Sequence, residues 1–131
     1  MKKWRNLELN GNETSAGIVV DLIAEGFKVS DWVVDISRRL DSKLKNNYEL
    51  WSISLDDLGF DGPTKIKDFY LKMEEHGYKT VPPEVALILR KIYTPQPKTE
   101  WLRIATPLDA MIDRDGVPHL PKLGSALGNL Y

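Results

Sequence analysis

The sequence predicts a single α+β domain over residues 1–131, with about four helices packed on one face of a small, mainly antiparallel sheet. Three observations lead to this fold class. Apolar residues recur at helical spacing in four segments, and apolar and polar residues alternate in two others. A turn-forming run, from Asp113 to Gly116, separates two short apolar arms and is typical of a β-hairpin.

The first helix is expected over residues 14–25. Its apolar residues recur at helical spacing, and Gly26 supplies a stop at its end. A second helix is expected to begin after Ser30, a favourable N-cap, and to end at Asn46 and Asn47. Its apolar face carries Trp32, Val33, Ile36 and Leu40, and its other face carries Arg38, Arg39, Lys43 and Lys45.

Residues 48–55 alternate between two faces and predict a strand with Trp51 in the core. Pro63 then favours the start of a third helix, because proline is tolerated in the first helical turn. This helix is expected to end at Gly77, and it has apolar residues with i, i+3, i+4, i+7 spacing at Ile66, Phe69, Tyr70 and Met73.

Residues 82–118 are the most informative stretch of the chain. Residues 85–93 are apolar on nearly every side of the expected fourth helix, which predicts that this helix is buried. An extended loop follows, because Pro95 and Pro97 disfavour helical backbone in the residues before them.

Residues 100–106 alternate as a strand, with Trp101 and Arg103 on one face. Residues 108–112 and 117–120 are the expected hairpin arms, and Gly116 suits a positive φ in their turn. The strand over 48–55, the strand over 100–106 and this hairpin are expected to form one sheet. In the last segment, Gly124 and Gly128 interrupt a weakly apolar tail.

Composition excludes several classes of function. The 18 basic and 19 acidic residues give a net charge of −1, so no overall field attracts the chain to nucleic acid or to an anionic membrane. Cysteine is absent, which excludes disulfides, thiolate nucleophiles and cysteine-based zinc sites. No segment is apolar and long enough for a secretory signal or a membrane span. We therefore expect a bacterial cytoplasmic protein without a metal, a cofactor or membrane association.

Two alternatives to simple binding remain open. A small hydrolase would use His76 or His119 with a carboxylate, although the two histidines lie on separate elements. A nucleic-acid-binding accessory protein would use the basic face over residues 38–45. The acidic run around Asp113 and Asp115 lacks the spacing of a calcium loop and is interpreted as a turn.

The candidate binding surface lies where the fourth helix passes through the proline-rich loop into a strand. Arginine and aromatic residues are common anchors at protein interfaces, and a proline-stiffened loop reduces the entropy lost on binding. The surface combines Arg90, Tyr93, Gln96, Glu100, Trp101 and Arg103. The predicted function is therefore non-catalytic binding of another protein. A competing interpretation is an internal ion pair between Arg90 and Glu100 around a buried Trp101.

A string of short motifs resembles a widespread group of small bacterial proteins of unknown function. The group shares a Pro-x-Glu-Val, Leu-Arg, Tyr, Gln-Pro, Glu-Trp-Leu, Asp-Gly-x-Pro string in that order. Here it reads Pro82-Pro83-Glu84-Val85, Leu89-Arg90, Tyr93, Gln96-Pro97, Glu100-Trp101-Leu102, Ile104-Ala105, Asp113, Asp115-Gly116 and Pro118. The resemblance covers residues 59–120 and implies a common fold; it implies no mechanism. Pro83 and Pro95 depart from the pattern of the group.

Overall fold

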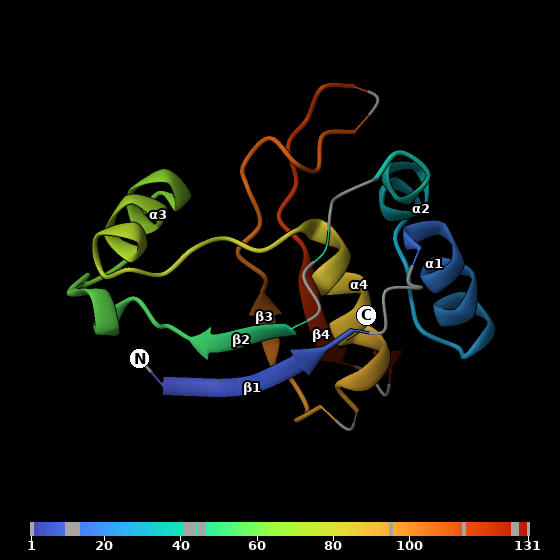
Figure 1. Ribbon diagram of the computed structural model, residues 1–131, viewed down its shortest axis with the longest axis horizontal. Coiled ribbons are helices and arrows are strands. Elements are labelled where there is room, and N and C mark those ends of the chain that lie inside the picture. Colours follow the sequence, from blue (N-terminus) through green and yellow to red (C-terminus); the bar gives the residue numbers. More distant parts are fainter. Residues whose placement is uncertain are drawn as a thin grey trace. The chain divides into compact units, whose positions relative to one another are not determined.

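Four α-helices and two small antiparallel sheets make up the part of the chain that the structure describes (Figure 1). This computed structural model describes residues 2–9, 14–40, 44, 47–94, 96–113, 115–126 and 129–130. The elements are β1 (Lys2–Glu8), α1 (Ser15–Ala24), α2 (Asp31–Ser37), β2 (Asn47–Ser52), the 3₁₀ turn η1 (Asp56–Leu58), α3 (Ile66–Glu75), α4 (Pro83–Ile92), β3 (Trp101–Arg103), β4 (Lys122–Ala126) and β5 (Asn129–Leu130). The predicted α+β class is confirmed, and the chain is a small α+β domain.

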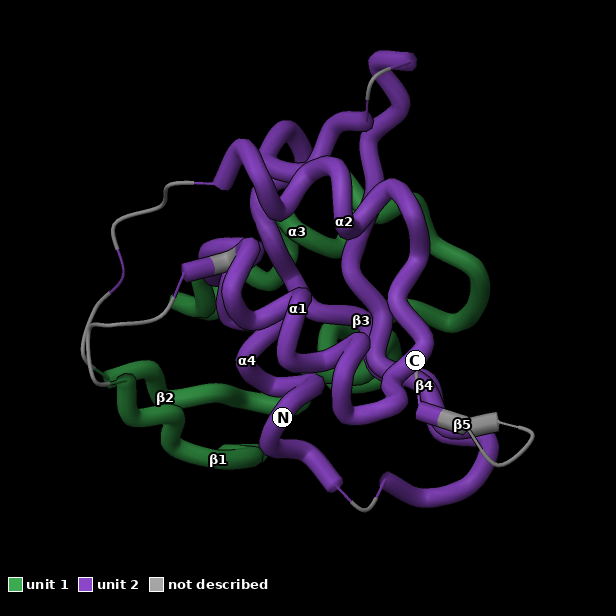
Figure 2. Tube along the Cα trace, turned by 90° about the vertical axis from the view of Figure 1, so that its right-hand side faces the viewer, with its two compact units in different colours: residues 1–11, 45–79 green, residues 12–44, 80–131 purple. Residues whose placement is uncertain are grey.

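Within this domain the chain forms two compact units that alternate along the sequence (Figure 2). Unit 1 comprises Met1–Gly11 and Lys45–Lys79, and unit 2 comprises Asn12–Leu44 and Thr80–Tyr131. Each unit contains helices and one of the two sheets.

Unit 1 is built on the antiparallel pair β1 and β2. Residues on one face of this pair, such as Leu7 and Leu50, are buried. After η1, helix α3 buries Tyr70 and Met73 and ends at Gly77, whose φ of 86° is the left-handed conformation expected of a C-terminal glycine. The predicted third helix and its stop are therefore confirmed, but the helix begins at Ile66 after the N-cap Lys65, so Pro63 lies before its first turn rather than in it.

In unit 2, helix α4 is the apolar helix that the sequence predicts from residues 85–93. Every residue from Pro83 to Arg90 is buried, which confirms the interpretation of α4 as an internal helix. Helix α1 packs on α4 and α2, and it buries Val19 and Leu22 almost completely. The Thr14 side chain caps α1 by accepting a hydrogen bond from the backbone N–H of Gly17.

Helix α4 also packs on β4, the central strand of the sheet β3-β4-β5. Strand β3 pairs with β4 in antiparallel register, with Trp101 opposite Gly124 and Arg103 opposite Lys122. Backbone hydrogen bonds continue this pairing on both sides of β3, since Ser125 N donates to Glu100 O and Ile104 N donates to Pro121 O.

The prediction of one sheet from residues 48–55, 100–106 and the hairpin is wrong. Strand β2 pairs with β1, and β3 pairs with β4. Sequence reasoning assigned no element to Lys2–Glu8, which forms β1. It assigned none to Lys122–Ala126, because Gly124 is a poor strand former. Glycine is nevertheless favoured here, because the indole ring of Trp101 occupies the space next to its Cα.

The predicted hairpin forms as a turn but not as a pair of strands. Asp113 N donates to Val117 O over 3.0 Å, and Gly116 has a φ of 79°, as expected. His119 N also donates to Met111 O over 2.7 Å, so these two bonds form an isolated bridge between Ile112 and Pro118 rather than a regular pair of strands.

Two expectations for individual elements also need correction. Helix α2 ends at Ser37 rather than at residues 46–47, and residues 41–43, 45 and 46 lie outside the described part of the chain. Trp51 is 40% exposed rather than in the core, because the buried face of β2 is the one that carries Leu50.

Candidate functional site

The six residues of the predicted surface lie on the last turn of α4, on the loop after it and on β3. The structure separates them into two groups. Arg90 and Gln96 are buried, and Tyr93 and Glu100 are half-buried. Trp101 and Arg103 are exposed on β3. The first group supports the loop from inside, and the second faces solvent.

Arg90 holds the loop to α4 and to the sheet. Its Nη2 donates to the backbone oxygen of Tyr93 over 2.6 Å, and its Nη1 donates to Gln96 Oε1 over 2.6 Å and to the oxygen of Gly124 over 3.4 Å. The guanidinium also lies 5.4 Å from the centre of the Phe27 ring. Burial lowers the pKa of Arg90, and an arginine nevertheless stays protonated at neutral pH.

Gln96 connects this arginine to the start of β3. Its Nε2 is close to three acceptors: the backbone oxygen of Leu123 at 3.1 Å, and the backbone oxygen and Oε1 of Glu100 at 3.2 Å. The Tyr93 hydroxyl donates to Glu100 Oε1 over 2.8 Å. The competing interpretation of an ion pair between Arg90 and Glu100 is therefore wrong in its partner, because Gln96 lies between the two residues and bonds to both.

Trp101 is more exposed than the residues of this network. Half of its surface, 50%, is exposed, so the expectation of a buried Trp101 is wrong. Its six-membered ring lies against Gly124 on the neighbouring strand, where an added Cβ would come within 2.2 Å of Cε3 and Cζ3. The backbone of β4 thus forms a flat support for the indole.

Arg103 lies two residues further along β3 and therefore on the same face of the strand. It is exposed, and so is its cross-strand partner Lys122. Sequence reasoning missed Lys122 and Gly124, which belong to this face. No local pattern in the sequence could have found them, because only the register of β3 and β4 places them beside Arg103 and Trp101.

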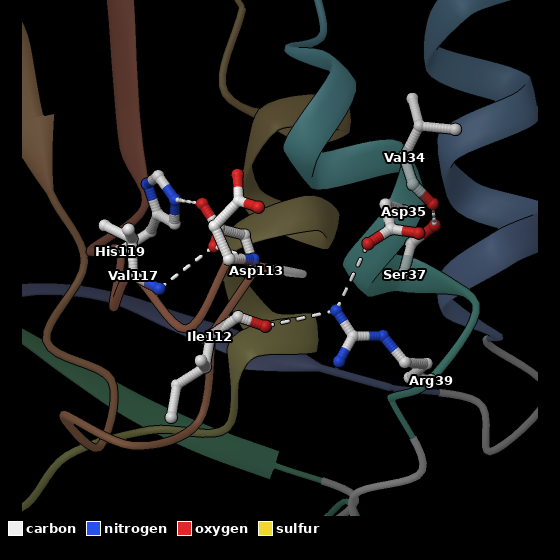
Figure 3. Close-up of polar contacts among 9 residues, drawn as sticks. Val34, Asp35, Ser37, Arg39, Ile112, Asp113, Val117 and His119 are labelled. Carbon is white, nitrogen blue, oxygen red and sulfur yellow. Dashed lines mark hydrogen bonds and ion pairs between the residues drawn. The ribbon is translucent and has the colours of Figure 1, made fainter.

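The hydrolase alternative depends on a histidine that meets a carboxylate, and His119 does (Figure 3). Its Nε2 lies 2.8 Å from Asp113 Oδ2, and its ring stacks on Trp32 with centroids 4.0 Å apart. Among the described residues, no serine or threonine hydroxyl forms a hydrogen bond with this ring. The contact with Asp113 closes the turn.

Asp113 stabilises the turn through both of its carboxylate oxygens. Its Oδ1 accepts the backbone N–H groups of Asp115 and Val117 over 2.9 and 3.0 Å. These bonds, and above all the one to His119, hold the pKa of Asp113 below its ordinary value of 3.8.

The stabilisation that Asp113 provides is expected to disappear in acid. A carboxylate with a pKa lowered by folding stabilises the fold above its unfolded pKa, and this contribution is lost as the pH falls through its folded pKa. Asp113→Asn should therefore be less stable than the wild type near neutral pH, and the difference should shrink at pH values below 3.8. Urea denaturation at several pH values measures this difference. A gap that stays constant into acid, or one reproduced by the neighbouring Asp115→Asn, would contradict the assignment.

His76 offers less to the hydrolase alternative. It is the exposed C-cap of α3, and its Nδ1 lies 2.9 Å from the backbone oxygen of Lys72. A histidine at this position satisfies a carbonyl of the last helical turn.

The basic face over residues 38–45 is only partly described. Arg39 binds Asp35 Oδ2 at 3.3 Å and the backbone oxygen of Ile112 at 3.1 Å (Figure 3). Arg38 is exposed, and Lys43 and Lys45 lie outside the described residues. Arg39 therefore ties α2 to the turn region, and this interaction reduces its availability for a phosphate.

Within the described ranges, no set of three or more histidine or acidic side chains is arranged to hold a metal ion. The described helices include none with the length and apolar character of a membrane span. No protein-family model, curated protein or solved structure matches the chain.

Proposed function

We propose that this chain is a non-catalytic binding protein that engages another protein through the surface around residues 90–103. The observation that carries this proposal is Trp101, a large aromatic side chain that is 50% exposed and lies flat against Gly124. Tryptophan and arginine are enriched among the residues that contribute most to protein–protein affinity.

The buried network supports this proposal by making the surface rigid before a partner arrives. Arg90 and Gln96 hold the loop between α4 and β3 through hydrogen bonds of 2.6 to 3.4 Å. A surface that is already ordered loses less entropy when a partner binds. The six predicted residues thus have two roles: Arg90, Tyr93, Gln96 and Glu100 position the strand, and Trp101 and Arg103 contact the partner.

The resemblance to the group of small bacterial proteins and a cytoplasmic location belong to the same proposal. Nothing in the resemblance assigns an activity to this surface. The hydrolase alternative ranks lower because His119 contacts a carboxylate but, within the described residues, no hydroxyl nucleophile.

Affinity capture from the native host tests the proposal. The wild type is compared with the Trp101→Ala/Arg103→Ala double variant, and the recovered partner is then purified and titrated against both by calorimetry. We expect the double variant to lose the partner, because both side chains point to solvent and their removal leaves the buried network in place. Trp51→Ala removes another exposed tryptophan, 40% exposed in unit 1, and serves as the matched control. Equal recovery by wild type and double variant would count against the surface.

A further inference from the structure

The outer face of β3 and β4 carries two cations that lie directly opposite each other. In this register Arg103 faces Lys122, and Trp101 faces Gly124. Backbone hydrogen bonds join residue 100 to residue 125 and residue 104 to residue 121. The pair Arg103 and Lys122 therefore occupies a position without backbone hydrogen bonds, where opposing side chains come closest.

Like charges at such positions repel each other and destabilise a sheet. Both side chains are exposed, and neither forms an ion pair with a carboxylate in the described ranges. The nearest acidic residue along β3, Glu100, is engaged by Tyr93 and Gln96. A partner that brings carboxylates would convert this repulsion into attraction.

Trp101, the aromatic residue of this face, indicates which other side chains a partner would present. Trp101 lies two residues from Arg103 on the same side of β3, so an extended segment lying along the strand would meet the indole and the cations in succession. Such a segment would present an apolar or aromatic side chain at Trp101 and acidic side chains at Arg103 and Lys122.

Nucleic acid also offers negative charge and stacking bases, but the charge of this face favours a peptide. Proteins that bind nucleic acid commonly use several cations to neutralise several phosphates. Among the described residues, this face has only the two cations named above, and the chain has a net charge of −1. We propose that the face formed by Trp101, Arg103, Lys122 and Gly124 docks an acidic segment of a partner protein. This inference rests on the proposed function above and adds the chemical class of its partner.

A random dodecapeptide library displayed on phage and panned on the full-length protein tests the inference. We expect the selected sequences to be enriched in Asp and Glu with a neighbouring apolar residue. The best peptide is then synthesised with a fluorescent label, and its affinity is measured by anisotropy. Arg103→Gln/Lys122→Gln should weaken binding about 2- to 30-fold, the effect of losing two exposed ion pairs. Added salt should also weaken it.

The control Lys67→Gln/Lys79→Gln removes the same charge from exposed lysines of unit 1 and should change the affinity less than 2-fold, because it removes no ion pair. A labelled oligothymidine of the same length provides the nucleic-acid arm. Tighter binding of the oligonucleotide, selected peptides without an acidic excess, or no selection at all would overturn the inference. If the selected peptides are neutral but still need Trp101 for binding, the acidic class of partner is wrong and the proposed function stands. Selected peptides that bind the Trp101→Ala/Arg103→Ala variant as well as the wild type would overturn both.

Discussion

Replacing Arg90 by alanine is expected to lower the free energy of unfolding by about 3–6 kcal/mol, because two short hydrogen bonds from a charged group each contribute about 1.5–3 kcal/mol. Both bonds are 2.6 Å long, to the oxygen of Tyr93 and to Gln96 Oε1. Arg90 is 3% exposed, so water cannot easily replace its hydrogen bonds. The substitution would leave buried acceptors without their donor, and the loop between α4 and β3 would lose its attachment.

Urea denaturation followed by far-ultraviolet circular dichroism measures this loss. Arg90→Lys keeps the charge but not the planar pair of donors, and it should recover only part of the stability. The matched control is Lys91→Ala on the next residue, whose ion pair with Asp21 is exposed and should contribute less than about 1 kcal/mol. A loss for Arg90→Ala as small as that of Lys91→Ala would show that the network does not hold the loop.

The helices could be predicted from the sequence because their signals are local. The apolar residues of α4 and the proline at its start are enough to predict that helix. The spacing of the apolar residues in α3 and the glycine after it, Gly77, are enough to predict α3. The pairing of the strands could not be predicted in this way. Strand β3 pairs with β4 across a long stretch of sequence: Trp101 and its cross-strand partner Gly124 are 23 positions apart, and no local pattern connects them.

In the candidate site, too, the sequence predicted what depends on neighbouring residues and missed what depends on distant ones. The sequence brought together the residues from Arg90 to Arg103 because they are close along the chain, and proximity cannot tell an inward side chain from an outward one. Arg90 was expected to be an anchor and is instead a buried support. Lys122 was missed because only the strand register places it beside Arg103.

Gly124→Ala is expected to destabilise the protein by about 1–3 kcal/mol, the usual cost of forcing extra atoms into a filled space. The new Cβ would lie 2.2 Å from two carbons of the Trp101 ring, so the indole must leave its place on β4. The φ of Gly124 is not positive, and the backbone itself therefore does not resist alanine. Denaturant titration measures this cost, and the change in tryptophan fluorescence reports the displaced ring.

A double-mutant cycle separates this steric cause from a general intolerance of alanine at residue 124. In a Trp101→Ala background the ring is absent, and Gly124→Ala should then cost less than about 0.5 kcal/mol. Gly62→Ala is the control, because no atom lies within 4 Å of its added Cβ. The same loss in both backgrounds would mean that Trp101 does not lie on Gly124, and the flat aromatic platform on which the binding proposals depend would then be absent.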